Sequence, residues 1–118
     1  MSWTLRQWIE LSCFPVAIAA GQILFKRAAG QLQAGGSWLL DLARLPTMWV
    51  AIALYAGATL LWVRILTTIP LSRAYPFVAL AFVLVPAAGY LFFNEAITPK
   101  YALGTALIVA GVIVAARA

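Results

Sequence analysis

The stretch AYPFVALAFVLVPAAGYLFF, residues 74–93, contains twenty residues and no charge. A helix needs about twenty consecutive apolar residues to cross the hydrocarbon core of a bilayer. Three further apolar stretches lie at about residues 8–28, 47–66 and 101–116. Because a spanning segment must satisfy its backbone hydrogen bonds internally, each stretch is predicted to be a helix. The sequence therefore predicts an all-α membrane protein with four transmembrane helices, forming a single domain over residues 1–118.

The composition excludes a water-soluble domain. Hydrophobic residues make up 65% of the chain and charged residues 9%, whereas soluble domains carry about 25% charged residues. The net charge is +5, but the basic residues are scattered singly near the ends of the spans, so we expect no nucleic-acid partner. Anionic lipid headgroups are the expected counter-charge.

The sequence lacks the residue sets that catalysis or metal binding would require. It has no histidine and a single cysteine, Cys13, so neither an intrachain disulfide nor a metal-ligand cluster is expected. The three acidic residues, Glu10, Asp41 and Glu95, lie far apart in the sequence. We therefore expect no enzyme activity, no cofactor and no metal, which leaves transport or membrane scaffolding.

The basic residues are divided evenly between the two sides of the predicted bundle. They are Arg6, Arg64, Arg73 and Arg117 on the side of the termini, and Lys26, Arg27, Arg44 and Lys100 on the other. Orientation in a membrane normally follows an excess of Lys and Arg on the cytoplasmic side, and this chain has no excess. The chain is therefore predicted to insert either way up and to pair with an inverted copy of itself.

Two basic residues and a glutamine are candidates for binding a charged headgroup. Arg64, near the end of the second span, is either a phosphate ligand or an anchor that snorkels to the headgroups. Ile18, Gln22 and Lys26 are four residues apart and share one face of the first span. That face is either the polar wall of a substrate groove, or Gln22 bonds a neighbouring helix and Lys26 anchors to headgroups.

The third span and the turn after it contain further candidates. Tyr75 is either an interfacial anchor or part of the groove. Pro76 and Pro86 each remove a backbone hydrogen bond, which produces either a fixed bend or a hinge. Glu95 lies in the turn and is expected to cap it or to pair with Lys100.

The last span has a marked start and a stripe of small residues. Thr98 suits the N-cap position and Pro99 the first helical position. Gly104 and Gly111 are seven residues apart, a spacing that lets two helix backbones approach closely. These glycines could pack within the chain, but we expect them to form the contact between subunits.

The order of these motifs resembles the small four-helix members of the drug/metabolite transporter superfamily. The motifs are Ala20-Gly21-Gln22 followed by Lys26, Ile69-Pro70-Leu71-Ser72-Arg73-Ala74-Tyr75-Pro76, Asn94-Glu95, and Gly104 with Gly111. The glycine pair is similar to the dimerisation pattern of the small multidrug resistance proteins, which form antiparallel dimers. The resemblance covers nearly the whole chain.

One departure changes what the resemblance implies. The drug exporters carry a membrane-embedded glutamate at the position occupied here by Ile18, and Glu10, two turns earlier, is a poor replacement. The Ala-Gly-Gln and Ala-Tyr-Pro patterns instead resemble the flippase subunits for aminoarabinose-linked undecaprenyl phosphate. That resemblance nominates Gln22, Lys26 and Tyr75 for the groove, in a system in which two different subunits cooperate.

The sequence thus favours a flippase that moves a polyprenyl-phosphate-linked sugar, or a similar anionic lipid, between the leaflets of the bacterial inner membrane. We expect Arg64 and Lys26, with Gln22 and Tyr75, to hold the phosphate in a positively charged groove without an embedded carboxylate. An antiparallel homodimer is the expected assembly, and a heterodimer with a related subunit is the alternative. The rival functions are export of small cations or drugs and a non-transporting accessory role beside a membrane glycosyltransferase.

Overall fold

The computed structural model describes residues 3–32 and 36–117, and all regular structure in these ranges is helical. The helices are α1 (Leu5–Gln31), α2 (Trp38–Arg44), α3 (Pro46–Leu66), α4 (Leu71–Val78), α5 (Ala81–Phe93) and α6 (Pro99–Arg117). Four segments are long and apolar enough to cross a membrane: α1, α3, the combined segment Leu71–Phe93, and α6. The prediction of an all-α membrane protein with four spans is therefore confirmed, with each helix extending one to three residues beyond one or both of its predicted ends.

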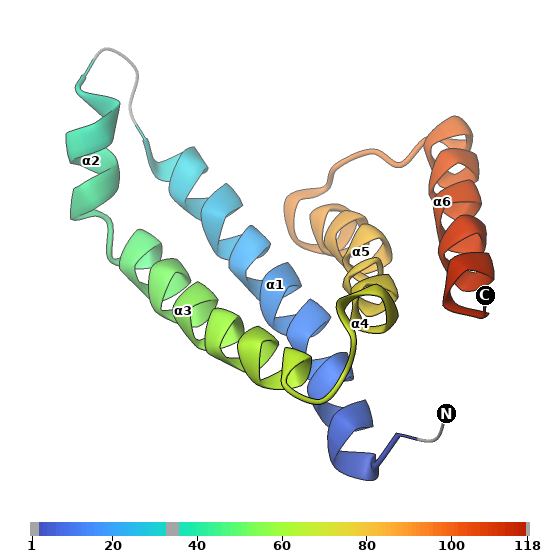
Figure 1. Ribbon diagram of the computed structural model, residues 1–118. Coiled ribbons are helices and arrows are strands. Elements are labelled where there is room, and N and C mark those ends of the chain that lie inside the picture. Colours follow the sequence, from blue (N-terminus) through green and yellow to red (C-terminus); the bar gives the residue numbers. More distant parts are fainter. Residues whose placement is uncertain (1–2, 33–35, 118) are drawn as a thin grey trace.

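The α1–α3 hairpin is the best-packed part of the structure (Figure 1). Leu11 of α1 is buried together with Ile65 of α3, and the stacked rings of Phe14 and Trp62 join the same two helices at 4.7 Å between centroids. α1 begins with a capping box, in which the side chains of Thr4 and Gln7 each accept from the other's backbone N–H. α1 of this hairpin also packs against α4 and α5, and so positions the rest of the chain.

The connection between α1 and α3 contains a helix that the sequence did not predict. Residues 38–44 form α2, with Asp41 in its first turn and Arg44 in its last, where each charge opposes the partial charge of that helix end. The side chains of Trp38, Leu39 and Leu40 are more than half exposed. We expect this short helix to lie at the membrane interface, where tryptophan side chains are enriched.

The third span is interrupted at Ala79 and Leu80, between α4 and α5. The N–H of Ala79 donates to Pro76 O and that of Leu80 to Phe77 O, each at 3.2 Å, so both residues form 3₁₀ turns. Pro76 itself lies inside α4, where its missing N–H removes the helical bond to Ser72 O. Pro86 lies inside α5 without ending it. Whether this interruption acts as a hinge stays a prediction.

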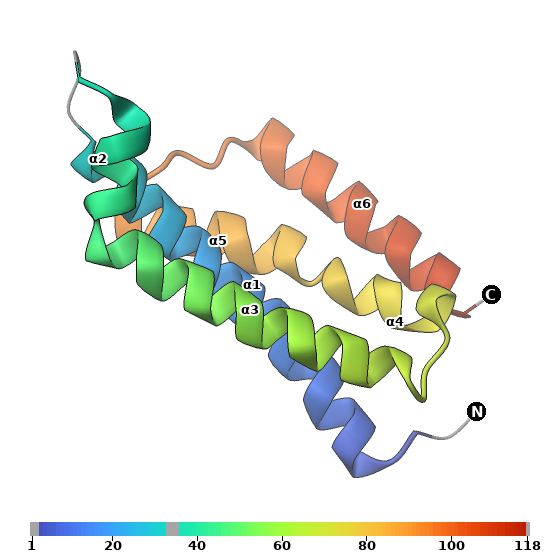
Figure 2. The same cartoon turned by 60° about the vertical axis from the view of Figure 1, so that its left-hand side comes forward.

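α6 lies on the side of α5 away from α3 and has no buried residue (Figures 1 and 2). Asn94 ends α5 in the left-handed conformation, with φ 53°. The N-cap predicted for the last span is confirmed, because Thr98 Oγ1 accepts from the N–H of Tyr101 at 3.1 Å. At the other end of α6, Arg73 Nη1 donates to Ala116 O at 3.2 Å.

Candidate functional site

A pocket of about 200 Å³ opens between α1 and α5 and contains two charged side chains. Its lining residues are Gln22, Ile23 and Lys26 of α1, Val85, Ala88, Gly89 and Phe93 of α5, and Glu95 in the following turn. Gln22 and Lys26 line it together because they are one helical turn apart on the same face of α1. The structure thus brings together two of the four predicted substrate-binding residues.

Gln22 is fixed in the pocket by a residue of α3. Its Nε2 donates to Tyr55 Oη at 2.6 Å, and the Tyr55 ring stacks on Phe25 with centroids 5.0 Å apart. Gly21 makes this arrangement feasible, because a Cβ at that position would overlap the Tyr55 ring. Of the two interpretations of Gln22, the bond to a neighbouring helix is observed, and it coexists with a position in the pocket wall.

Lys26 pairs with Glu95 across the mouth of the pocket. Lys26 Nζ lies 3.7 Å from Glu95 Oε2, and the two side chains are 58% and 51% exposed. The expected pairing of Glu95 with Lys100 was wrong: the turn after α5 directs the carboxylate toward α1, where Lys26 is the nearer cation. A purely positive site was expected from the sequence. The structure instead places one charge of each sign at this pocket.

A second, largely apolar pocket of about 320 Å³ adjoins the first and shares Gln22 and Val85 with it. Its other lining residues are Ile18, Val78, Ala81, Phe82, Pro86 and Tyr101. Ile18, which occupies the position of the drug exporters' glutamate, is thus part of an apolar wall. The two pockets together form a surface that is charged at one end and apolar along its length.

Arg64 lies in a separate cluster at the other end of α1. Glu10 Oε1 lies 3.3 Å from Arg6 Nε and Glu10 Oε2 lies 3.3 Å from Arg64 Nε. The Glu10 side chain is only 16% exposed, and among the described residues no donor is aligned to give its Oε2 a hydrogen bond. Glu10 and Lys26 are sixteen residues apart on α1, which is about 24 Å along a helix. Arg64 and Lys26 therefore do not share one site. The expectation of a groove without an embedded carboxylate was wrong at Arg64, because the largely buried Glu10 lies beside it.

Tyr75 is 61% exposed and packs edge-on against Trp62 of α3, with centroids 6.2 Å apart. It lines a cavity of about 480 Å³ between α4, α5 and α6, with Ser72, Pro76, Val78, Ala79, Phe82, Val112 and Ala115. Tyr75 therefore does not line the pocket that contains Gln22 and Lys26. Its ring contact, Trp62, is two residues from Arg64 in the sequence of α3.

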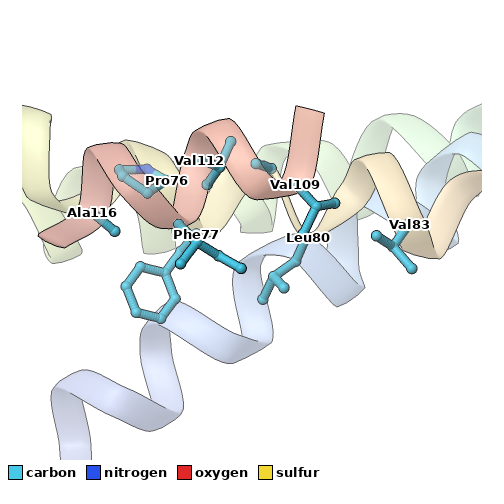
Figure 3. A pocket seen from close by; sticks show the side chains of 9 residues that line it. Pro76, Phe77, Leu80, Val83, Val109, Val112 and Ala116 are labelled. Atoms are coloured by element: carbon cyan, nitrogen blue, oxygen red, sulfur yellow. The ribbon is translucent and has the colours of Figure 1, made fainter. Parts of the chain in front are cut away.

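A further pocket, of about 250 Å³, lies between α4, α5 and α6 (Figure 3). Pro76, Phe77, Leu80 and Val83 point into it from one side, and Val109, Val112 and Ala116 from the other. This lining offers no charged group to a headgroup.

Gly104 and Gly111 are both exposed on α6. A Cβ at either position would meet nothing within 4 Å among the described residues. These glycines therefore form no close contact between helices of the described chain. Their role between subunits stays a prediction.

Sequence reasoning missed two residues that shape these sites, Tyr55 and Gly89, and it missed the pairing of a third, Glu10. Tyr55 pairs with Gln22, and Glu10 pairs with Arg64, across helices that are distant in the sequence. No local sequence pattern predicts such pairs. Gly89 did carry a signal, since an isolated glycine inside an apolar helix often marks a close approach. A Cβ at Gly89 would overlap the Glu95 carboxylate.

Curated relatives of the chain share one description. The chain is 35% identical over 96 residues to a probable 4-amino-4-deoxy-L-arabinose-phosphoundecaprenol flippase subunit, ArnE, of Hamiltonella defensa. The match covers 77% of this chain and 86% of the relative. ArnE proteins of Salmonella newport and Salmonella typhimurium are each 36% identical, covering 80% of this chain and 82% of the relative. No family model and no solved structure matches. With this identity across most of both chains, and with four helices able to span a bilayer, the protein is a multi-pass membrane protein that belongs to the family of ArnE flippase subunits.

Proposed function

We propose that this protein moves a polyprenyl-phosphate-linked sugar between the leaflets of the bacterial inner membrane. The observation that carries the proposal is the continuity of the charged pocket at Lys26 with the apolar pocket that begins at Gln22. A lipid with a charged headgroup and a long apolar chain needs such adjoining surfaces. The names of the ArnE relatives, which specify an aminoarabinose-phosphoundecaprenol, support this class of substrate.

In this proposal Lys26 and Arg64 serve opposite ends of the transport path. Lys26, with the amide of Gln22, binds the phosphate at one membrane surface. Arg64, about 24 Å away along the bundle, receives it near the other surface, with Tyr75 beside the exit. The separation is close to the roughly 30 Å thickness of the hydrocarbon core. The interruption after Pro76, together with Pro86, supplies the flexibility that exposes the path to one leaflet and then the other.

We further propose that the chain works as an antiparallel homodimer through α6. The even division of basic residues supports the inverted copy, and the exposed Gly104 and Gly111 support close helix contact. The word subunit in the names of the relatives supports a second polypeptide. Co-purification of two differently tagged copies tests the homodimer, and recovery of only a related chain would replace it with a heterodimer.

The ion pairs of Glu10 argue against the rival cation exporter. An exporter of that kind needs an embedded carboxylate that its cargo can reach, whereas both oxygens of Glu10 lie 3.3 Å from arginine. A cationic drug would have to displace a guanidinium. Efflux measured for wild type and Glu10→Gln separates the two functions, since drug efflux that depends on Glu10 would favour the exporter.

Reconstitution tests the flippase directly. The pure protein is placed in liposomes with a fluorescent polyprenyl-phosphate lipid, and leaflet exchange is followed by quenching of the outer leaflet. Lys26→Gln is expected to slow exchange about tenfold, the effect of losing one charge-assisted hydrogen bond. Arg27→Gln is the matched control, because Arg27 follows Lys26 in the sequence but does not line the pocket. Exchange no faster than in empty vesicles would remove the flippase proposal, and with it a transporting role.

A further inference from the structure

The turn after α5 holds the Glu95 carboxylate in a defined position. Asn94 reverses the chain in the left-handed conformation, and the N–H of Glu95 donates to Gly89 O at 3.2 Å. The missing side chain at Gly89 leaves room for the carboxylate to fold over α5, toward Lys26. Two separate backbone features therefore fix an acidic group at the mouth of a pocket that also contains a basic one.

The Lys26–Glu95 pair is weak enough for a ligand to replace. Its atoms are 3.7 Å apart and both side chains are more than half exposed, and exposed pairs of this kind contribute little to stability. A ligand that supplies an anion to Lys26 and a cation to Glu95 gains two charge-assisted contacts while breaking one long pair. A ligand that supplies only an anion brings its charge close to the Glu95 carboxylate and is repelled.

We propose that Glu95 recognises the ammonium group of an amino-sugar headgroup while Lys26 binds the phosphate of the same lipid. This proposal rests on the proposed function, because it assumes a lipid-linked sugar as substrate. The headgroup replaces the Lys26–Glu95 pair with the sugar ring between the two side chains. Glu95 is thus a specificity determinant, which selects an amino sugar over a neutral one, and the apolar pocket beyond Gln22 receives the start of the polyprenyl chain.

The test compares two probes that differ only at the amine. One is a short-chain polyprenyl phosphate carrying a 4-amino pentose, and the other is its N-acetylated form. Binding to the full-length protein in detergent is measured by calorimetry, and exchange is measured in liposomes. Wild type is expected to bind the amino probe about tenfold more tightly than the acetylated one. Glu95→Gln, a substitution of the same size, is expected to abolish this preference, because the amino probe loses its carboxylate contact and the acetylated probe is no longer repelled.

Three controls separate a role in recognition from a structural role. Lys26→Gln is expected to weaken both probes equally, because both carry the phosphate. Asp41→Asn removes a carboxylate on α2, outside the pocket, and is expected to change neither. Gly89→Ala keeps the Glu95 charge but displaces its carboxylate, and is expected to reduce the preference with no loss of helix content by circular dichroism.

The outcomes distinguish this proposal from the proposed function. Equal binding of the two probes by wild type would overturn the role of Glu95, whether or not the protein moves lipid. An equal loss for both probes in Glu95→Gln would also overturn it, since the carboxylate would then only hold the turn. A preference that depends on Glu95, found in a protein that exchanges neither probe, would uphold recognition and defeat the transport proposal instead.

Discussion

Gly21→Ala is expected to destabilise the α1–α3 hairpin, because the added methyl group occupies space that the Tyr55 ring fills. The ring cannot simply move away. It is stacked on Phe25 at 5.0 Å and its hydroxyl accepts from Gln22 at 2.6 Å. Relief of the overlap therefore requires either a wider separation of the helices or loss of both contacts.

The expected size of this effect follows from opposing contributions. Overpacking of a filled interface costs about 1–3 kcal/mol, and loss of the hydrogen bond to Tyr55 adds about 1 kcal/mol. Replacing glycine by alanine within a helix returns about 1 kcal/mol through helix propensity. The net loss is about 1–3 kcal/mol, which lowers the folding equilibrium constant roughly 5- to 150-fold.

Gly57→Ala is the matched control for this measurement. Gly57 lies in the exposed surface of α3, and a Cβ there would meet nothing within 4 Å of the described residues. It gains helix propensity without a clash, so it is expected to be as stable as wild type or slightly more stable. Reversible unfolding in mixed micelles by added dodecyl sulfate, followed by far-ultraviolet circular dichroism, compares the two. Equal midpoints for the two variants would refute the reasoning.

Three further predictions concern the turn before α6 and α6 itself. Asn94→Ala is expected to cost about 1 kcal/mol because alanine is strained at φ 53°, while Asn94→Gly should be nearly neutral in the same unfolding assay; equal effects would contradict the left-handed turn. Thr98→Ala is expected to cost about 1 kcal/mol through loss of the cap on Tyr101, whereas Thr98→Ser should retain it. Gly111→Leu is expected to abolish crosslinking between copies in membranes without changing helix content, and undiminished crosslinking would exclude this face from the contact.

The four spans were predictable because their signal is additive along the chain. Twenty apolar residues in 74–93 predict a membrane helix whatever lies beside them. The start of α6 was equally local, since Thr98 and Pro99 carry the capping chemistry themselves. The seven residues of α2 were missed because so short a segment makes just under two turns, and periodicity needs a longer window.

The charge pairs were not predictable for the opposite reason. Glu10 and Arg64 meet only because α1 and α3 are antiparallel neighbours in one particular register, and the same holds for Gln22 with Tyr55. The sequence shows which charged residues the chain contains, but it does not show which carboxylate pairs with which cation in the folded chain. The expectation of a purely positive groove failed at this step, while the nomination of Gln22 and Lys26 for one wall agrees with the pocket that they line.

The exposure of α6 has a consequence for how sequence change is tolerated in this protein. No side chain of α6 lines the charged pocket or belongs to the core around Leu11 and Ile65. Sites without shared neighbours respond independently to substitution. Substitutions at residues 102–117 can therefore adapt α6 to a new partner while headgroup recognition at α1 and α5 is retained. Partner specificity and headgroup specificity can thus evolve independently.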